Sequence, residues 1–408
     1  MKLERLVLEN FRGFESFTLD FHPELTVIAG INGSGKTSIL DSSLVLLRNC
    51  AMNGVSGGFA HSDCQNGKLT ARASLWGSTQ FARAGTWQGE MKFERTAWTM
   101  TTRYALPFSN EQRDAGPLPI WPYFQVNRHA EDATPGSTNP QVWRAEKAWQ
   151  PIHGAREFTD FFSWFRERED LENEERRDNP THVDHLLEAV REALVGILPN
   201  YEKPRVRRPR FGGNDTDTPV SNTPVLTVTK DGRELAFNQL SEGERTTAAL
   251  ACDIARRLAV ANPNGDPLQG EGVVLIDEID LHLHPKWQAQ VIDALRRTFP
   301  NIQWVVTTHS PIVLSRVPSE SVRLIKDFQL VENLPLTSGR DPNALLTDIF
   351  ESPLRPDDVE NQIHQVAALI DSENLEGAKS ALSALQQRLG RDDREVTRLS
   401  AMISFLEA

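Results

Sequence analysis

The strongest constraint on the fold is a glycine-rich octapeptide that directly follows a short apolar run. Residues 30–37 read GINGSGKT, which matches the phosphate-binding loop pattern GxxxxGK(S/T). The preceding residues 25–29, LTVIA, predict a buried strand, and after the loop apolar and small residues recur at helical spacing. Because such a loop joins a strand to a helix, the sequence predicts an α/β domain with a phosphate site at the strand end.

The residues of this loop predict a site for ATP and Mg²⁺. Glycines let backbone N–H groups point inward, where they and the start of the following helix hold phosphate oxygens. Lys36 is expected to reach the β- and γ-phosphates, and the Thr37 hydroxyl to bind Mg²⁺. A glycine-rich turn without a ligand is the alternative, disfavoured because strand and helix both flank the loop. The residues predicted to contact the nucleotide are Asn32, Gly33, Ser34, Gly35, Lys36, Thr37 and Ser38.

A second motif places two carboxylates at the end of another apolar strand. Residues 273–280 read VVLIDEID. Beside a nucleotide, Asp277 is expected to hold Mg²⁺ through water, and Glu278 to polarise the attacking water. Two exposed loop acids are the alternative, which the apolar run before the acids disfavours.

A histidine also lies at the end of a predicted strand. His309 ends the run WVVTTH and is predicted to hydrogen-bond a γ-phosphate. A zinc cluster formed by His282, His284 and His309 is the alternative, but a phosphate site already accounts for these positions. The order strand, helix, strand predicts a parallel sheet with its ligands at the carboxyl ends.

Composition narrows the cellular setting. The 408 residues predict two or three domains, or one large domain with an insertion. Lysine and arginine number 44 against 56 acidic residues, a net charge of −12, so contact with nucleic acid would require a local basic patch. The three cysteines are too few for a disulfide framework, and neither a signal peptide nor a membrane helix is evident. We therefore expect a cytoplasmic protein without a membrane partner.

The chain is expected to divide into four regions. Residues 1–150 hold the loop and a β-subdomain, residues 151–200 form an inserted helical lobe, residues 201–335 complete the α/β part, and residues 340–408 form a helical tail. In the lobe, Thr181 is the predicted N-cap of the second helix. The face of that helix is predicted to be Val183, Leu186, Leu187, Val190 and Leu194. The lobe core is predicted to contain Phe158, Phe161, Phe162, Trp164 and Phe165.

Five motifs in fixed order resemble an ABC/SMC-type ATPase head of the RecF kind. They are NFRGF at 10–14, GINGSGKT, LSEGER at 240–245, DEID and TTHSP. The resemblance implies an α/β fold of the ABC/SMC-head-type P-loop NTPase, with ATP hydrolysis as its activity. It also implies that two heads sandwich two ATP molecules, so that Ser241 and Gly243 act on the nucleotide of the other head.

Two further roles follow from this resemblance. Gln125 is expected to be the glutamine that links Mg²⁺ to the lobe, and Arg12 to contact the nucleotide. A plain strand residue at Gln125 and a surface ion pair at Arg12 remain open alternatives.

Other phrases are similar to compact ATPases of the Septu and retron-associated antiphage systems. They are DEIDLHLHPKWQ, PYFQVNR at 122–128, DLENEER at 170–176, and LLTDIF. This resemblance implies a homodimer or higher homo-oligomer that holds a separate HNH-type nuclease subunit.

The sequence therefore favours an ATP-dependent switch that controls a partner nuclease. A RecF-like DNA repair ATPase acting directly on DNA is the main alternative, and it would use the basic cluster of Lys203, Arg205, Arg207, Arg208 and Arg210. The ATPase subunit of a membrane transporter is a weaker alternative, because the forms NFRGF and LSEGER are unusual there.

Overall fold

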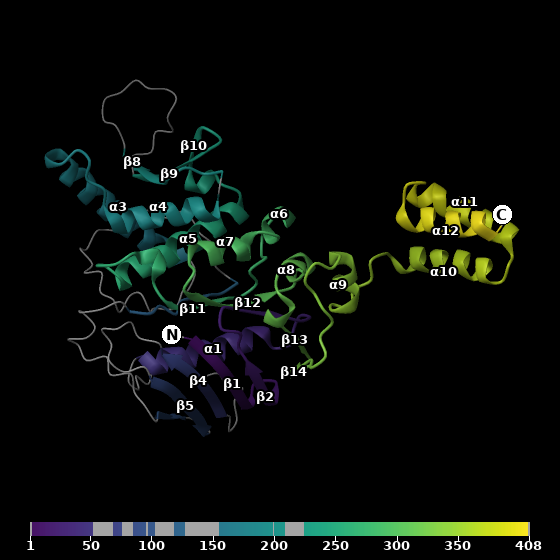
Figure 1. The fold of residues 1–408 in the computed structure, drawn as a ribbon, viewed down its shortest axis with the longest axis horizontal. Helices are drawn as coiled ribbons and strands as arrows, with labels where there is room; N and C mark the ends of the chain where they lie inside the picture. Colours follow the sequence, from purple (N-terminus) through teal and green to yellow (C-terminus); the bar gives the residue numbers. More distant parts are fainter. Residues whose placement is uncertain are drawn as a thin grey trace. The chain divides into compact units, whose positions relative to one another are not determined.

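The computed structural model divides the chain into two compact units, Met1–Arg340 and Asp341–Ala408 (Figure 1). The residues that the structure describes are 2–51, 68–75, 85–94, 97–102, 118–126, 155–198, 200–208 and 224–406. Within them, no helix combines the length and apolarity needed to cross a membrane.

A six-stranded sheet forms the centre of the first unit. Its strands are β3 (Leu25–Ala29), β7 (Tyr123–Phe124), β11 (Gly272–Ile276), β12 (Ile302–Thr308), β13 (Val322–Lys326) and β14 (Gln329–Leu330). Their order is β14-β13-β3-β12-β11-β7, and all neighbours run parallel except β13 and β14. Strands β3, β11 and β12 are buried along their whole length, as expected for parallel strands covered on both faces. The strand predicted at 25–29 is confirmed.

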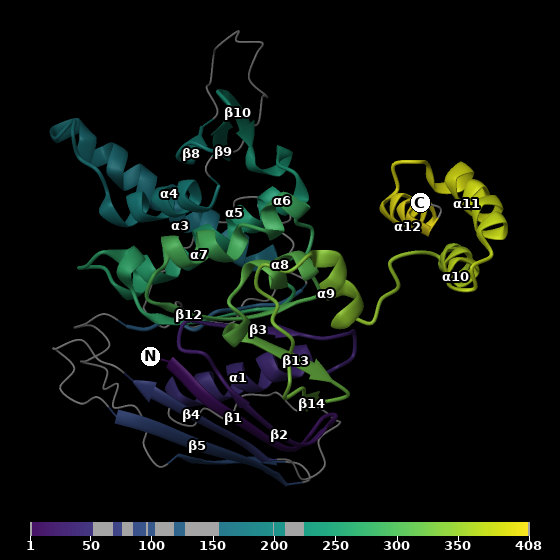
Figure 2. The same ribbon diagram turned by 45° about the vertical axis from the view of Figure 1, so that its right-hand side comes forward.

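Helices cover both faces of this sheet. Helix α1 (Lys36–Ala51) lies on one face, and helices α5 (Glu242–Ala261) and α7 (Val291–Thr298) lie on the other (Figure 2). Because β3, β11 and β12 are parallel neighbours, the residues that follow them emerge at one edge of the sheet. The predicted parallel sheet is thus confirmed, and its strand order brings the loop, the acids and His309 to one edge.

The segment that opens at Pro285 forms two helices. Helix α6 (Pro285–Gln288) ends before α7 begins, because Gln290 leaves the helical backbone region with φ −124°. Helix α8 (Pro311–Arg316) follows β12, with Ser310 as its N-cap.

An antiparallel sheet carries the N-terminal part of the first unit. It has the order β2-β1-β4-β5-β6. Its strands are β1 (Lys2–Phe11), β2 (Phe14–Asp20), β4 (Lys68–Leu75), β5 (Gly85–Glu94) and β6 (Ala97–Thr102). The side chain of Gln303, fully buried in β12, donates to the carbonyls of Leu3 and His22 and accepts from the Leu3 amide at 2.7 Å. One buried amide therefore ties the two sheets together.

The helical lobe contains α3 (Ala155–Asp178) and α4 (His185–Ile197), which lie near α5 (Figure 1). The prediction of Thr181 as N-cap is wrong: Asp184 caps α4, accepting from the amides of Leu186 and Leu187 at 3.0 and 2.9 Å. Val183 consequently lies before the helix and is 50% exposed. The predicted aromatic core is confirmed for Phe161, Phe162, Trp164 and Phe165, while the Phe158 side chain lies outside the described residues.

A small sheet joins the lobe to α5. It contains β8 (Arg205–Arg207), β9 (Val225–Lys230) and β10 (Arg233–Ala236) in the order β10-β9-β8. Both of its strand pairs are antiparallel. Short 3₁₀ turns occur at Phe237–Gln239, Pro267–Gln269 and Ser319–Ser321.

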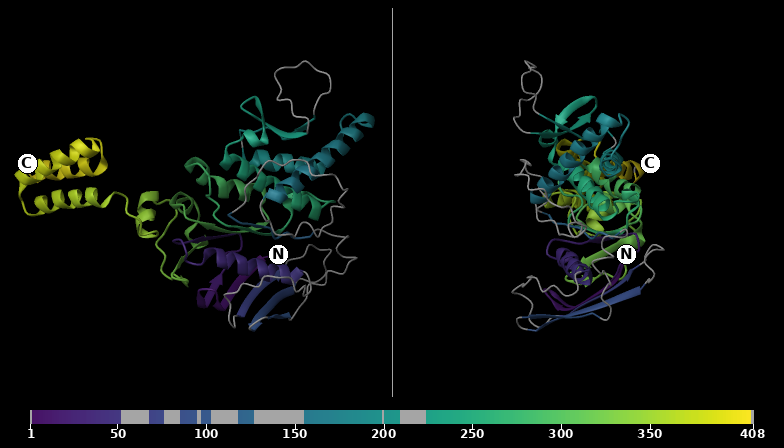
Figure 3. Two further views of the ribbon diagram at one scale, coloured as in Figure 1. Left: turned by 180° about the vertical axis from the view of Figure 1, so that it is seen from behind. Right: turned by 90° about the vertical axis from the view of Figure 1, so that its left-hand side faces the viewer.

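The second unit is helical. It contains α9 (Pro342–Asp348), α10 (Asp357–Asp371), α11 (Leu375–Leu389) and α12 (Arg394–Leu406), the last three packed on one another (yellow in Figure 3). On α10, an apolar stripe is buried and packs with apolar residues of α11 and α12; its residues are Val359, Ile363, Val366 and Ile370. This unit therefore has a hydrophobic core of its own.

Candidate active site

The edge of the parallel sheet carries a cavity of about 530 Å³, a size suited to a small-molecule ligand. It lies where the loop after β3, the acids after β11 and the residue after β12 converge. Its lining consists of Arg12, Gly13, Asn32, Gly33, Gly35, Lys36, Thr37, Ser38, Asp277, Glu278, His309 and Phe328.

The loop conformation depends on its glycines. Gly30 and Gly35 have φ angles of 152° and 101°, which side-chain-bearing residues rarely adopt. A Cβ on Gly35 would also lie 2.5 Å from the ring of Phe14, so this position has no room for a side chain. The residue types of the motif thus allow the tight turn from which the α1 amides face the cavity.

Lys36 is held inside the loop. Its Nζ donates to the carbonyls of Gly30 and Ile31 at 3.0 and 2.8 Å, and the residue is only 7% exposed. Burial lowers the pKa of Lys36 to about 8, although the nearby carboxylates of Asp277 and Glu278 oppose this shift. A phosphate group in the cavity would restore the charged form.

The next residue connects the loop to the acidic strand end. The Thr37 hydroxyl donates to Asp277 Oδ2 at 2.8 Å, and the Thr307 hydroxyl donates to Asp277 Oδ1 at 2.6 Å. Both carboxylate oxygens of the 2% exposed Asp277 are therefore engaged. Mg²⁺ prefers oxygen ligands, and the adjacent oxygens of Thr37 and Asp277 could hold it.

Glu278 lies beside Asp277 in an unusual backbone conformation. Its φ is 49°, and its amide donates to the Thr307 hydroxyl at 2.7 Å. Left-handed backbone at a residue with a side chain costs energy and often marks a functional position. The turn places Glu278 in the cavity lining, where its carboxylate could accept a proton from water.

His309 completes this wall of the cavity. Burial and the nearby Lys36 lower the pKa of the His309 imidazole, while Asp280 and Asp277 oppose the shift. The neutral ring is therefore favoured, and it can donate one hydrogen bond to a phosphate oxygen.

Arg12 reaches the cavity from the turn between β1 and β2. Its Nη1 donates to the Ser38 hydroxyl at 2.9 Å and to Asp41 Oδ2 at 2.8 Å. The ion pair that was the alternative for Arg12 exists, and it holds the guanidinium at the cavity wall.

Four predicted residues do not belong to the cavity lining. Ser34 is 3% exposed within the loop. Gln125 directly follows β7, whose Phe124 carbonyl accepts from the Asp277 amide at 2.8 Å, so Gln125 lies near the acidic strand end. Ser241 and Gly243 lie at the start of α5.

The start of α5 is tightly specified. The Ser241 hydroxyl donates to Glu244 Oε2 at 2.8 Å, and Glu244 is also paired with Lys230 of β9. A Cβ on Gly243 would lie 2.4 Å from the carbonyl oxygen of His282, so only glycine fits against the segment after β11. The LSEGER segment and the residues after the DEID motif therefore pack as one structure.

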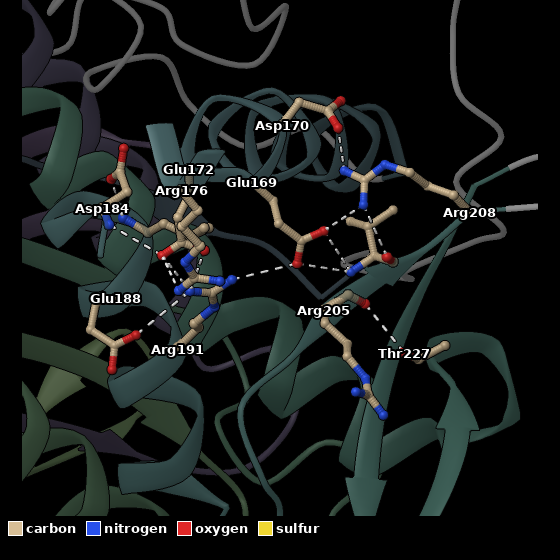
Figure 4. A network of polar contacts seen from close by, with 12 residues as sticks. Glu169, Asp170, Glu172, Arg176, Asp184, Glu188, Arg191, Arg205, Arg208 and Thr227 are labelled. Atoms are coloured by element: carbon tan, nitrogen blue, oxygen red, sulfur yellow. Dashed lines mark hydrogen bonds and ion pairs between the residues drawn. The ribbon is translucent and has the colours of Figure 1, made fainter. Parts of the chain in front are cut away.

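The basic cluster provides no free patch in the described residues. Arg205 and Arg207 are paired with Glu234, and Lys203 is paired with Glu188. Arg208 is paired with both Glu169 and Asp170, as Figure 4 shows. Arg210 lies outside the described residues. The hypothesis that this cluster binds nucleic acid loses support, because its described cations already have carboxylate partners.

Sequence reasoning missed two features of the site. The Thr307 hydroxyl hydrogen-bonds both the Asp277 carboxylate and the Glu278 amide. In the sequence, its only signal is the pair of threonines directly before His309. Phe328 and Gly13 line the cavity from two turns far apart in sequence, and nothing local signals their meeting.

The fold and the cavity together are those of a P-loop ATPase. The family model described as "AAA domain, putative AbiEii toxin, Type IV TA system" matches residues 92–315, and a second, "AAA ATPase domain", matches residues 1–81. Since the first match covers more than half of the chain, the chain belongs to that AAA-domain family.

Curated relatives agree with this assignment. The chain is 28% identical to the retron Ec83 probable ATPase of Escherichia coli, covering 99% of this chain and 86% of the relative. It is 36% identical to the retron Vc95 probable ATPase of Vibrio cholerae, over 52% of this chain and 48% of the relative. Identity to the Septu protein PtuA of Bacillus thuringiensis is 26%, over 76% and 72% of the two chains. The chain is thus similar to ATPases of retrons and to a Septu protein.

An SMC head and RecF are among the solved structures that resemble this chain. An SMC head bound to a domain of ScpA gives a TM-score of 0.47 at 15% identity, covering 81% of this chain and 97% of the other. The recombination mediator protein RecF in a nucleotide complex gives a TM-score of 0.42 at 12% identity, covering 80% of this chain and 97% of the other.

Proposed function

We propose that this chain is an ATP-driven switch in antiphage defence, in which two heads close around ATP and thereby control a partner nuclease. The observation that carries the proposal is the position of Ser241 and Gly243. They lie at the solvent-accessible start of the twenty-residue helix α5, yet neither belongs to the described lining of the cavity in their own chain. A second head could bring the same helix start onto the nucleotide, where its amides would favour phosphate.

Within one head, the proposed roles follow the geometry. Lys36 and the loop amides bind phosphate oxygens, and Arg12 contacts the nucleotide beside Ser38. Thr37 and Asp277 hold Mg²⁺, with Gln125 reaching it from the neighbouring strand; bound Mg²⁺ neutralises phosphate charge. Glu278 orients water and accepts its proton, and His309 donates to the γ-phosphate.

Mixing two inactive variants tests the two-headed arrangement. Lys36→Ala disables the loop of its own head, and Ser241→Arg blocks the helix start that serves the other head. Each variant alone is expected to lose hydrolysis. In a mixture, half of the dimers pair the two variants and contain one intact site, so activity returns to about a quarter of the wild-type value.

If Ser241 instead served its own cavity, the mixture would stay inactive. Ser380→Arg, a substitution at an exposed serine of α11, is the control for adding an arginine elsewhere. A chain that stays monomeric in solution with and without Mg-ATP, for wild type and Glu278→Gln, would contradict closure of two heads.

The relatives support the proposed output. Their names place them with retrons and the Septu system, and the resemblance of this sequence to such ATPases implies a separate HNH-type nuclease subunit. The test is cleavage of plasmid DNA by the co-purified complex, compared with each subunit alone. We expect the ATPase alone to cleave nothing, and cleavage by the complex to differ between Mg-ATP and Mg-ADP. Cleavage by the ATPase alone would overturn this part of the proposal.

A further inference from the structure

One wall of the cavity has no role in the phosphate chemistry. Among the described residues that line the cavity, Phe328 is the one with an apolar side chain. It lies at the tip of the hairpin between β13 and β14, and its ring is partly exposed. The remaining lining is glycine or polar and suits phosphates, metal and water.

The backbone at this tip is strained. Asp327 and Phe328 have φ angles of 49° and 61°, a pair of left-handed conformations that a two-residue hairpin normally assigns to asparagine and glycine. An aromatic residue is poorly suited to this position, and its presence indicates that the ring itself serves a purpose.

The surroundings make room for the ring and fix its orientation. A Cβ on Gly13 would lie 2.3 Å from the Phe328 ring, and one on Gly35 would lie 2.9 Å from it. Phe14 meets the ring edge-on, with centroids 5.3 Å apart and an interplanar angle of 88°. Since Phe14 is only 1% exposed, Phe328 is the ring of this pair that a ligand can reach.

We infer that Phe328 stacks on the base of the bound nucleotide and makes the site prefer purine nucleoside triphosphates to bare triphosphate. The inference rests on the proposed nucleotide site. A nucleotide with its phosphates on Lys36 and Thr37 must place its base against some wall, and a planar base gains most from an aromatic ring. Phe328 touches the phosphate-binding loop at Gly35, so base and phosphates occupy adjacent parts of one cavity.

Binding measurements on the full-length chain test this role. The probes are Mg-ATP, Mg-GTP, Mg-UTP and inorganic triphosphate with Mg²⁺, titrated into wild type and variants. In the wild type, ATP should bind more tightly than triphosphate by about 5- to 150-fold, the range that base stacking supplies. Phe328→Leu should lose most of this ratio while its triphosphate affinity stays unchanged. Phe328→Trp should keep the ratio.

A second variant moves the Phe328 ring while leaving Phe328 itself in place. The backbone of Gly13 is not left-handed, so alanine fits its backbone conformation and Gly13→Ala mainly displaces the Phe328 ring. This variant should weaken the binding of ATP but not that of triphosphate. If Phe328→Leu and Gly13→Ala bind ATP as tightly as wild type, the base lies elsewhere and the inference is overturned, while the nucleotide site stands. If wild type binds neither ATP nor triphosphate, the proposed nucleotide site and this inference both fail.

Discussion

The charge of Lys36 depends on what occupies the cavity. Its pKa of about 8 lies below the ordinary lysine value of 10.5, and bound phosphate would raise it again. ATP binding at about pH 9 should therefore take up close to one proton, measured by calorimetry in two buffers of different ionisation heat. Lys36→Met should remove this uptake. Equal uptake in both proteins would contradict the assignment.

The lowered pKa of Lys36 also makes the stability of the folded chain depend on pH. The unfolded chain keeps the Lys36 proton up to about pH 10.5, whereas the folded chain loses it near pH 8. The free protein should therefore gain stability from this group as pH rises between these values, and Lys36→Met should lack this contribution.

Glu278 is predicted to act on the water and not on nucleotide affinity. Glu278→Gln keeps the shape of the side chain but removes its basicity, so single-turnover hydrolysis should fall by about 10²- to 10⁴-fold. ATP affinity should stay within about twofold, because the loop and Asp277 are intact. Glu202→Gln, at an exposed carboxylate, is the control and should change neither quantity. A variant that hydrolyses normally would exclude Glu278 as the base.

The lobe depends on a buried charge cluster that Figure 4 shows. Arg191 Nη1 donates to both oxygens of Glu172 at 3.0 Å, and Arg191 Nη2 donates to Glu169 at 3.4 Å. Glu169 also accepts from the Val206 amide at 3.1 Å, which attaches β8 to α3. Arg191→Met should lower the free energy of unfolding by about 3 kcal/mol in denaturant, because Glu169 and Glu172 then keep only the more exposed Arg208 and Arg176 as cations.

Neutralising the carboxylates is the matched control for this cluster. Glu169→Gln and Glu172→Gln combined with Arg191→Met should recover part of the lost stability, because no uncompensated buried charge remains. No difference between Arg191→Met and wild type would show that the cluster does not hold the lobe.

The cap of α4 can be tested directly. Asp184→Ala removes two bonds to helix amides and the ion pair with Arg168, and should lower the free energy of unfolding by about 1–2 kcal/mol. Thr181→Ala should change it by less than about 0.5 kcal/mol. The reverse order of effects would support Thr181 as the cap.

The start of α4 could not be predicted from the sequence alone. Thr181 and Asp184 both precede the apolar run, and their local residue types permit either start. The choice is made by tertiary contacts, because the Asp184 amide also donates to the buried Glu172 at 3.1 Å. The P-loop and DEID motifs were predictable because each is contiguous. The meeting of Phe328 with Gly13 was not, because it depends on β13 pairing with β3.

The two units of the whole chain should be separable in their stability. Val366 is 1% exposed in the core of α10–α12, so Val366→Asp buries a charge without a partner and should unfold those helices. The loss should appear as reduced helical circular dichroism. ATP affinity should stay within about twofold, because the described lining of the cavity lies entirely within Met1–Arg340.

His364→Asp on the same helix is the control, since the His364 side chain is 74% exposed and a carboxylate there stays in water. If Val366→Asp abolished ATP binding, the helical unit would be part of the nucleotide-binding structure. If the variant kept ATP binding but lost the partner nuclease, the helical unit would be the element through which the switch acts. Measuring ATP affinity and nuclease co-purification in one variant therefore distinguishes a role in nucleotide binding from a role in binding the partner.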